Sequence, residues 1–303
     1  MMEFTLETQG RFSLAATRRF LDGLTPASGT FADDEDRLAM AFPVDGWAGS
    51  AGAIVWQDGE HIRGEAVVSS PDVSIEAVRG QVARTLSLDH DGTGWDDVGR
   101  RDPVIGRLQD EFDHLRPVCF YSPYEAAVQA IVGQRISIRQ AVTIKTALAK
   151  EYGEALEIGG QRLDAFSLPQ SLTDVNEAHG LRIEKLRRLH EVARAALEGR
   201  LDAAHLRALP HDEALAGLRE IRGLGELSAE HVLLRGAGLA DAVPLADPRT
   251  RVAIKAAYDL RVKPGDAELT AIADAWRPFR MWGFVLVRLW HERTAGGSLH
   301  RDR

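Results

Sequence analysis

A tight glycine turn between two amphipathic stretches is the feature that most constrains the fold of this 303-residue chain. Residues 221–229 read IRGLGELSA, so Gly223 and Gly225 are separated by one residue and a helical pattern follows directly. Because glycine has no Cβ, such a turn lets another molecule come close to the free backbone N–H groups at a helix start. A helix start attracts anions, and a nucleic-acid phosphate fits there. The pattern therefore predicts two helices joined by a phosphate-binding hairpin.

A single carboxylate follows the turn by about twenty residues, in the sequence LADP at residues 245–248. Asp247 followed by a proline and an apolar-periodic segment is typical of an ordinary helix N-cap. From the local sequence alone, that structural cap is the favoured interpretation. A carboxylate at a helix N-terminus also stays ionised, which is what a stabiliser of positive charge requires.

Composition excludes several classes of protein. Apolar residues make up 45% and charged residues 27% of the chain, which is ordinary for a soluble globular protein. No apolar run approaches the roughly 18 residues of a membrane span, and the start lacks the basic-then-apolar pattern of a signal segment. Cys119 is the only cysteine, so neither an internal disulfide nor a cysteine-built metal site is expected. We expect a cytoplasmic protein.

The net charge of −8 is unusual for a nucleic-acid binder, but its distribution is uneven. Residues 1–110 hold 19 acidic and 10 basic residues, whereas residues 111–303 hold 26 acidic and 27 basic ones. The acidity therefore lies in the first third, and the remainder can form a local basic face. We expect a moderate electrostatic contribution to binding, with few phosphates neutralised.

The first third of the chain has mixed strand and helix patterns. Helical spacing covers residues 14–24 and 75–86, and Asp58-Gly59 is a hairpin signal. Short apolar runs predict strands at residues 4–6, 37–42, 51–56 and 62–68. We expect residues 1–95 to form an α+β domain, with helices packed on a small antiparallel sheet.

Residues 88–103 are polar and are interpreted as a linker, and everything after them has helical patterns. Several prolines lie at or near the expected helix starts, where a missing N–H is harmless. The candidate helices are residues 104–114, 123–133, 137–152, 184–198, 211–220, 226–236, 249–259, 265–275 and 279–293. The chain from 104 onward is thus predicted to be all-α.

Together with the glycine turn and Asp247, three stretches resemble the helix-hairpin-helix superfamily of DNA glycosylases, in particular the DNA-3-methyladenine glycosylase II branch. The stretches are SPYEA at residues 122–126, AIVGQRIS at 130–137 and WRPFRMW at 276–282. They occur in the family's order and cover most of the chain. The resemblance implies a two-lobed helical glycosylase core over residues 104–303, with the hairpin at 221–229, that acts in base excision repair of double-stranded DNA.

The resemblance also implies a mechanism, because Asp247 falls on the family's catalytic aspartate position. An alkylated purine such as 3-methyladenine or 7-methylguanine already carries positive charge and leaves without protonation. Asp247 would stabilise the oxocarbenium character that develops on the sugar and orient the attacking water, without a metal. Bifunctional relatives carry a lysine where this chain has Leu227, and none of its five lysines occupies that position. A hydrolase without lyase activity is expected.

Residues for DNA contact follow from the same motifs. The hairpin would present N–H groups to phosphates, and its carbonyl groups bind a monovalent cation in some relatives; no other cofactor is expected. Arg135 stands where the branch usually has an apolar wedge that fills the gap of a flipped base, although a solvated loop arginine is an equal alternative. Gln134 is expected to support the loop or touch the DNA backbone. The predicted DNA-binding residues are Gly223, Leu224, Gly225, Ser228, Gln134 and Arg135.

The base pocket of this branch is aromatic, because cationic bases bind well to π faces. Trp290 matches a pocket tryptophan of the family, and Phe20 matches another aromatic position weakly. His231 stands where the best-known branch has a tyrosine; it can hydrogen-bond a base edge, but a structural role is the favoured alternative. A core position is an even alternative for Trp282 and Phe20. The predicted pocket residues are Trp290, Trp282, Leu227, His231 and Phe20.

Two other functions compete with excision of alkylated bases. One is a glycosylase of the same fold for deaminated or oxidised purines, which the departures at Leu227, His231 and Arg135 favour. The other is a non-catalytic protein that binds DNA lesions, which the acidic charge balance favours. A pure binder would not need Asp247. In each case duplex DNA is the expected partner, and we expect a nucleoid-associated monomer with no obligate protein partner and no membrane contact.

Overall fold

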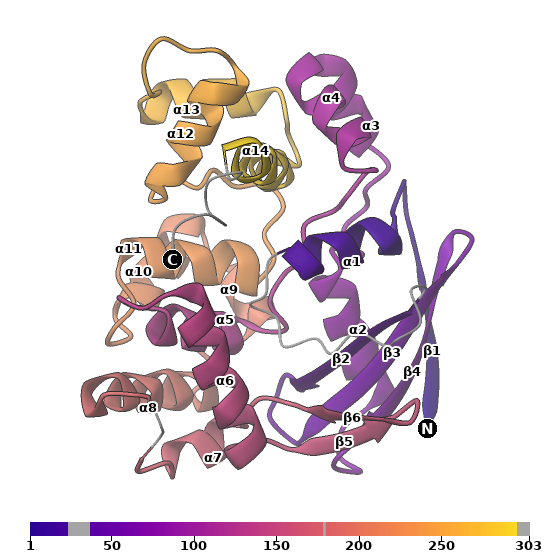
Figure 1. Ribbon diagram of the computed structural model, residues 1–303, viewed down its shortest axis with the longest axis vertical. Helices are drawn as coiled ribbons and strands as arrows, with labels where there is room; N and C mark the ends of the chain where they lie inside the picture. The colour runs from indigo at the N-terminus through magenta and orange to yellow at the C-terminus, as the bar shows by residue number, and fades with distance from the viewer. Residues whose placement is uncertain (24–36, 178–179, 296–303) are drawn as a thin grey trace.

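A four-stranded antiparallel sheet forms one side of the molecule in the computed structural model, which describes residues 1–23, 37–177 and 180–295 (Figure 1). Its strand order is β1-β4-β3-β2. The strands are β1 (Met2–Glu7), β2 (Arg37–Pro43), β3 (Ser50–Asp58) and β4 (His61–Val68). Asp58 pairs with His61 across the turn at Gly59, as the hairpin signal predicted. All four predicted strands are therefore confirmed.

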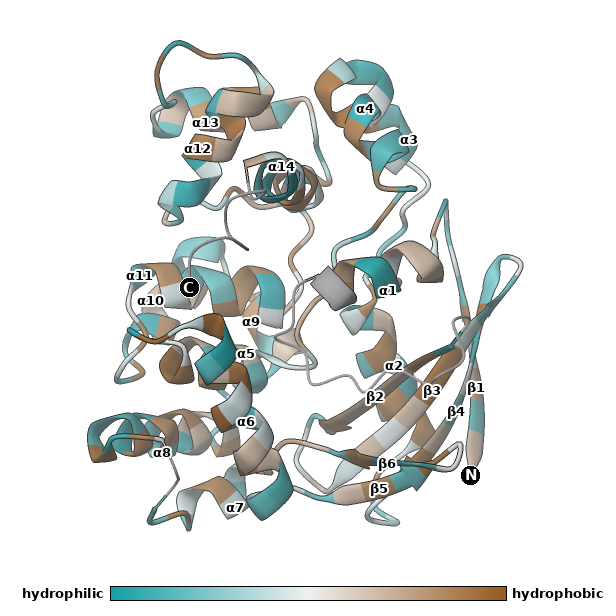
Figure 2. Cartoon of the chain, viewed as in Figure 1, coloured by the Kyte–Doolittle hydropathy of each residue, from teal (hydrophilic) through white to brown (hydrophobic). Residues whose placement is uncertain are grey.

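Both faces of this sheet are covered. Leu38, Met40 and Phe42 point to one face of β2, where they join the larger hydrophobic core, while Ala39 and Ala41 point to the other face. This explains why β2 is apolar almost throughout instead of alternating (Figure 2). The first face packs on α1 (Leu14–Gly23) and α2 (Ile75–Thr85), both of which were predicted.

A second β-hairpin covers the other face, and it contradicts the prediction of an all-α chain after residue 104. The strands β5 (Ala155–Ile158) and β6 (Gln161–Asp164) pack on the sheet through Leu156, Ile158 and Leu163. Gly159 and Gly160 both have positive φ angles and form the turn. Strands of four residues give too short an alternation to be recognised in the sequence.

The predicted linker at 88–103 is also wrong in part, because it contains the helix α3 (Trp95–Arg101). Trp95 anchors this helix in the core, where its ring lies 5.5 Å from that of Trp282. The next helix, α4 (Pro103–Glu111), begins after the N-cap residue Asp102, whose carboxylate accepts hydrogen bonds from the N–H groups of residues 104 and 105.

Two large hydrophobic clusters organise the rest of the chain. The first combines the sheet, α1 and α2 with α3, α4 and three helices near the C-terminus, so both ends of the chain share one core. Those three helices are α12 (Pro248–Ala257), α13 (Asp266–Asp274) and α14 (Arg280–Ala295). The second cluster is built by helices from the middle of the chain (Figure 1).

The helices around the second cluster are α5 (Pro123–Val132), α6 (Ile138–Tyr152), α7 (Pro169–Thr173), α8 (Ile183–Leu197), α9 (Ala203–Ala208), α10 (His211–Arg219) and α11 (Glu226–His231). The helix α11 continues into a π-helical turn, η1 (Val232–Gly236). Every helix predicted after residue 104 is confirmed within a few residues at its ends. The short helices α7 and α9 were not predicted.

Candidate active site

Asp247 is the N-cap of α12, as its local sequence predicted. Its Oδ1 accepts a hydrogen bond from the backbone N–H of Arg249 at 3.0 Å, and Pro248 occupies the first helical position. The residue is 8% exposed. The carboxylate is therefore fixed by the backbone and still reaches a cavity.

Two arginines hold the carboxylate of Asp247. The Nε of Arg249 lies 2.9 Å from Oδ1, its Nη2 lies 3.0 Å from Oδ2, and Nη1 of Arg288 lies 2.5 Å from Oδ2. Burial by itself raises the pKa of Asp247, but the hydrogen bonds and charges of Arg249 and Arg288 outweigh it and leave this pKa below its ordinary value. Asp247 is thus an anion at neutral pH.

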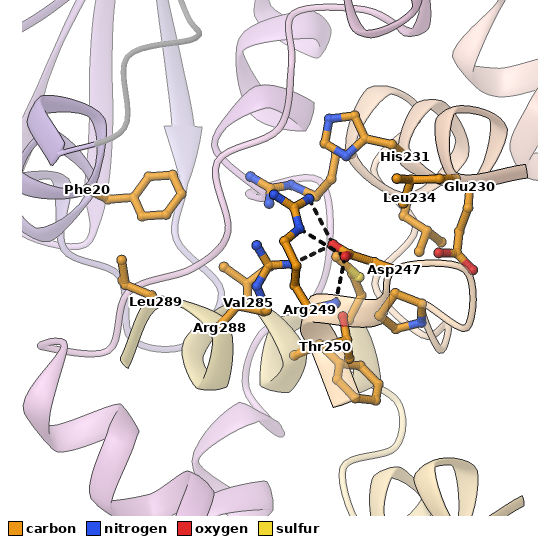
Figure 3. Close-up of a pocket in the computed structure, with 15 residues that line it drawn as sticks. Phe20, Glu230, His231, Leu234, Asp247, Arg249, Thr250, Val285, Arg288 and Leu289 are labelled. Carbon is orange, nitrogen blue, oxygen red and sulfur yellow. Dashed lines mark hydrogen bonds and ion pairs between the residues drawn. The ribbon is translucent and has the colours of Figure 1, made fainter. Parts of the chain in front are cut away.

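A pocket opens in front of Asp247 (Figure 3). Its empty volume is about 670 Å³, a value that includes the space open to solvent at its mouth. In Figure 3, Phe20 and Leu289 lie on one side of the pocket and Asp247 and His231 on the other. The lining residues are Phe20, Leu227, Glu230, His231, Leu234, Arg235, Pro244, Asp247, Arg249, Thr250, Met281, Phe284, Val285, Arg288 and Leu289.

The pocket contains three of the five residues that were predicted to line it, namely Phe20, Leu227 and His231. Trp282 and Trp290 lie elsewhere. Trp282 is 2% exposed and packs between other core rings, with Phe279 at 4.6 Å. Trp290 stacks against the guanidinium group of an arginine of α4, at 5.3 Å.

Helix geometry explains this correction. Met281, Val285, Arg288 and Leu289 recur at the spacing of one helix face, and this face of α14 lines the pocket. Trp282 follows Met281 by one residue, about 100° further around the helix, and so enters the core instead.

Sequence reasoning missed the charged lining residues Glu230, Arg235, Arg249 and Arg288. Glu230 and Arg235 belong to one face of α11 and η1, which begins at Leu227. Counted from Leu227, the pocket-lining residues of this face follow after three, four, seven and eight positions. That spacing was a usable signal. Arg249 and Arg288 gave none, because arginine is abundant along the whole chain.

His231 is an uncharged ring in this pocket. Burial, followed by the charges of Arg235 and Arg249, lowers the pKa of His231 to about 4. Its ring meets that of Phe120 edge to face at 5.2 Å between centroids. At neutral pH the imidazole therefore offers one donor and one acceptor nitrogen rather than a positive charge.

Glu230 connects the hairpin to Asp247. It is 5% exposed, and its two carboxylate oxygens accept hydrogen bonds from the backbone N–H of Ala246 at 3.0 and 3.1 Å. Burial raises the pKa of Glu230. The helix that follows the glycine turn thus holds the residue directly before Asp247.

The glycine turn joins α10 to α11. Gly223 has a φ of +102°, which strains any residue with a Cβ, and an added Cβ would lie 2.7 Å from Ile131 Cδ1 and 2.8 Å from Arg188 Cδ. Gly225 is exposed at the start of α11, where an added Cβ would meet no atom within 4 Å. Leu224 is buried and anchors the turn, whereas Ser228 is half-buried in the first turn of α11.

Replacing Gly223 by alanine is expected to lower the free energy of unfolding by about 1–2 kcal/mol, because a Cβ is strained in the left-handed region and crowds Ile131. Duplex affinity should fall with it. Urea denaturation and fluorescence anisotropy at fixed salt measure the two effects. Gly225→Ala is the matched control for stability, since Gly225 has a φ of −85° and open space around it. Equal unfolding midpoints for both variants would contradict the assignment.

The loop between α5 and α6 supports the turn. Gln134 donates a hydrogen bond from Nε2 to the carbonyl of Gly223 at 2.9 Å and accepts one from Arg188 Nη1 at 2.8 Å. Gln134 thus supports the turn in this structure, and its expected contact with the DNA backbone stays a prediction. Arg135 is exposed and has a φ of +57°, so its side chain projects from the loop next to the hairpin. The wedge role of Arg135 stays a prediction.

Neither a metal site nor a membrane span is found in the described residues. No cluster of three or more His, Cys, Asp or Glu side chains with the arrangement of a metal site occurs in residues 1–23, 37–177 and 180–295. Over the same ranges, the helices lack the length and apolar character that crossing a bilayer requires. The predicted cation at the hairpin stays a prediction.

Known proteins with similar sequences are named DNA-3-methyladenine glycosylases. No family model matches the chain. It is 24% identical to a DNA-3-methyladenine glycosylase of Bacillus subtilis over 213 residues, 67% of this chain and 69% of that protein. It is 29% identical to DNA-3-methyladenine glycosylase 2 of Escherichia coli over 196 residues, 62% of this chain and 64% of that protein. The second match thus spans less than two thirds of the relative's length.

Solved structures extend the likeness to nearly the whole chain. The 3-methyladenine DNA glycosylase of Archaeoglobus fulgidus superposes with a TM-score of 0.74 at 19% identity, over 98% of this chain and all of that one. The relatives and the solved structures support the suspected likeness to the helix-hairpin-helix superfamily of DNA glycosylases. An 8-oxoguanine glycosylase/lyase of Clostridium acetobutylicum, bound to duplex DNA, shares the fold with a TM-score of 0.61 at 15% identity over 82% of this chain and 86% of that one. The superfamily fold is thus present together with an ionised aspartate in a pocket.

Proposed function

We propose that this protein is a monofunctional DNA glycosylase that flips alkylated bases of the 3-methyladenine and 7-methylguanine type out of duplex DNA and excises them by hydrolysis. The observation that carries the proposal is Asp247, an ionised N-cap aspartate at the wall of a pocket. The residue before it, Ala246, is hydrogen-bonded to Glu230 on the helix that follows the glycine turn. The names of the two curated relatives support the substrate class.

The chemistry needs one anion and a water molecule. As the glycosidic bond breaks, positive charge develops on the sugar, and a fixed carboxylate within a partly buried pocket stabilises that charge. A methylated purine that is already cationic leaves as a neutral base, so no general acid is required. Asp247 also orients the attacking water and accepts its proton.

The DNA would lie across the surface that holds the glycine turn and the α5–α6 loop. The backbone N–H groups at the start of α11 would bind a phosphate, and Arg135 would enter the duplex beside it. The arginine contacts that hold Asp247 are compatible with this arrangement, since the Arg249 side chain is 67% exposed and can turn toward a phosphate.

Water is the proposed nucleophile because no lysine is among the pocket-lining residues that the structure describes. Leu227 occupies the position from which a lysine would attack the sugar, and its side chain faces the pocket mouth with 43% exposure. Lys145 is buried in an ion pair with Glu125, and Lys185 donates to the carbonyl of Val132.

Incubation with a duplex that carries one 7-methylguanine is expected to release the base and leave an abasic site, which hot alkali then cleaves. Sodium borohydride in the reaction should trap no covalent protein–DNA adduct, because a Schiff base requires an amine. A glycosylase/lyase on its own lesion duplex is the positive control for trapping. Failure to release any base would reject the proposed function. A trapped adduct would show that the mechanism is not purely hydrolytic.

A glycosylase for deaminated or oxidised purines is the second candidate. The uncharged His231 and the three arginines in the pocket favour it, because these groups suit keto oxygens and ring nitrogens better than a cation. The fold shared with the 8-oxoguanine glycosylase/lyase is compatible with this candidate.

A further inference from the structure

Four basic side chains gather beside the glycine turn. Two of them flank it directly, because Arg222 precedes Gly223 in the chain and a Cβ added at Gly223 would lie 2.8 Å from Arg188 Cδ. The others stand on α8 before Arg188, at its N-cap and in its first turn. We call these four residues the basic cluster: Arg182, Lys185, Arg188 and Arg222. In a chain with a net charge of −8, a local group of positive charges indicates a surface for an anionic partner.

The positive charge of the basic cluster is only partly compensated. One carboxylate oxygen serves two of its arginines, since Glu184 Oε1 lies 3.2 Å from Arg222 Nη2 and 3.5 Å from Arg188 Nε. The Arg182 side chain forms no hydrogen bond or ion pair with the residues that the structure describes. Burial, followed by the charges of Arg182 and Arg188, lowers the pKa of Lys185. The cations therefore repel one another, and a bound anion would relieve that repulsion.

Hydrogen bonds fix the inner part of the basic cluster to the turn and to the α5–α6 loop. Arg188 Nη1 donates to Gln134 Oε1 at 2.8 Å, and Lys185 Nζ donates to the carbonyl of Val132 at 2.8 Å. Gln134 in turn donates to the carbonyl of Gly223. The cluster is thus held in place relative to the turn before any partner arrives, which lowers the cost of binding.

The outer part of the basic cluster is open to solvent. The Arg222 side chain is 63% exposed, and Arg182 is also exposed. An exposed ion pair such as that of Arg222 with Glu184 contributes little in water, so a phosphate can replace the carboxylate at low cost. The planar guanidinium group suits phosphate oxygens. Duplex DNA fits several adjacent cations because it presents its phosphates in a continuous row.

We propose that the basic cluster is a second binding surface for the phosphate backbone of duplex DNA, next to the proposed phosphate site at the glycine turn, and that it binds intact DNA without reading its sequence. The DNA footprint then extends from the start of α11 along α8. This inference rests on the proposed function, because that function makes duplex DNA the substrate. It concerns the grip on the DNA and not the excision of the base.

The salt dependence of binding tests the proposal. Fluorescence anisotropy with a short undamaged duplex gives the association constant at several salt concentrations. Each lost phosphate contact reduces the slope of its logarithm against the logarithm of salt concentration by about 0.9. We expect this change for Arg182→Gln and for Arg222→Gln, with binding about three- to tenfold weaker at about 0.1 M salt and about 10- to 100-fold weaker for the double variant.

Arg63→Gln is the matched control. Arg63 on β4 pairs with one carboxylate, that of Asp58, at 2.7 Å, and its side chain is 57% exposed, so its environment resembles that of Arg222. It belongs to the sheet, on the side of the molecule opposite α8 (Figure 1). The variant removes the same charge and should leave the slope unchanged. Wild-type slopes for both cluster variants would overturn the proposal, and so would an equal reduction in the Arg63 control, which would reflect net charge alone.

Glu184→Gln gives a readout in the opposite direction. If its carboxylate competes with phosphate for the basic cluster, duplex binding should tighten about two- to fivefold at low salt. If the carboxylate only ties α8 to the turn, binding should weaken, which would contradict the proposal. Base release from a lesion duplex is measured separately. Its absence with the expected slopes would reject the proposed function alone, whereas base release with unchanged slopes would reject this inference alone.

Discussion

Replacing Asp247 by asparagine is expected to lower single-turnover base release by about 100- to 1,000-fold, the range seen when one fixed electrostatic group is removed from an active site. Asparagine caps a helix about as well as aspartate and keeps the size of the side chain, so α12 should still begin at Pro248. What disappears is the negative charge that the proposed mechanism places next to the sugar. Quenched reactions with excess protein and a 7-methylguanine duplex measure the effect.

The matched control for this variant is Asp202→Asn. Asp202 is the N-cap of α9, where its carboxylate accepts a hydrogen bond from the N–H of His205 at 2.6 Å, and it does not line the pocket. This variant should excise bases at the wild-type rate. Unchanged base release by the Asp247→Asn variant would contradict the catalytic role proposed for Asp247. Lesion binding without base release by the wild-type protein would instead favour a non-catalytic binder.

Replacing Glu125 by glutamine is expected to lower the free energy of unfolding by about 3–5 kcal/mol, because it leaves a buried lysine without its counter-charge. Glu125 on α5 and Lys145 on α6 meet at 2.9 Å between Oε2 and Nζ inside the second hydrophobic cluster. Their side chains are 1% and 3% exposed, so water cannot replace the lost partner. Urea denaturation followed by circular dichroism measures the change.

Glu191→Gln serves as the control, since Glu191 forms a solvent-exposed pair with Arg194 at 2.5 Å and should contribute about 0–1 kcal/mol. A double variant, Glu125→Leu with Lys145→Met, removes both charges and should recover most of the stability. Similar losses for the buried and the exposed pair would show that the buried charges are not isolated from solvent.

The sequence predicted much of the fold because the relevant signals are long. Helices of nine residues or more repeat their apolar positions often enough to be recognised, and the strands before residue 70 are long and bounded by clear turns. The hairpin at residues 155–164 was missed because its strands are four residues each. Its place on the sheet depends on side chains from β2 and β3 that are far away in the sequence.

The site was predicted less completely. Asp247 was assigned by resemblance, because its local sequence indicates a helix cap and nothing more. Trp282 and Trp290 were placed in the pocket because aromatic content on α14 does not tell which face meets a cavity. The contact of Glu230 with the backbone of Ala246 could not be predicted, because it depends on how the chain returns after η1.

The shared core of the two chain ends has a consequence for the order of folding. Phe20 on α1 and the pocket-lining face of α14 meet only when segments from opposite ends of the chain come together. Contacts between residues so distant in sequence are entropically costly and form late. A nascent chain that has already made the glycine turn and Asp247 therefore lacks one wall of the pocket until α14 has left the ribosome.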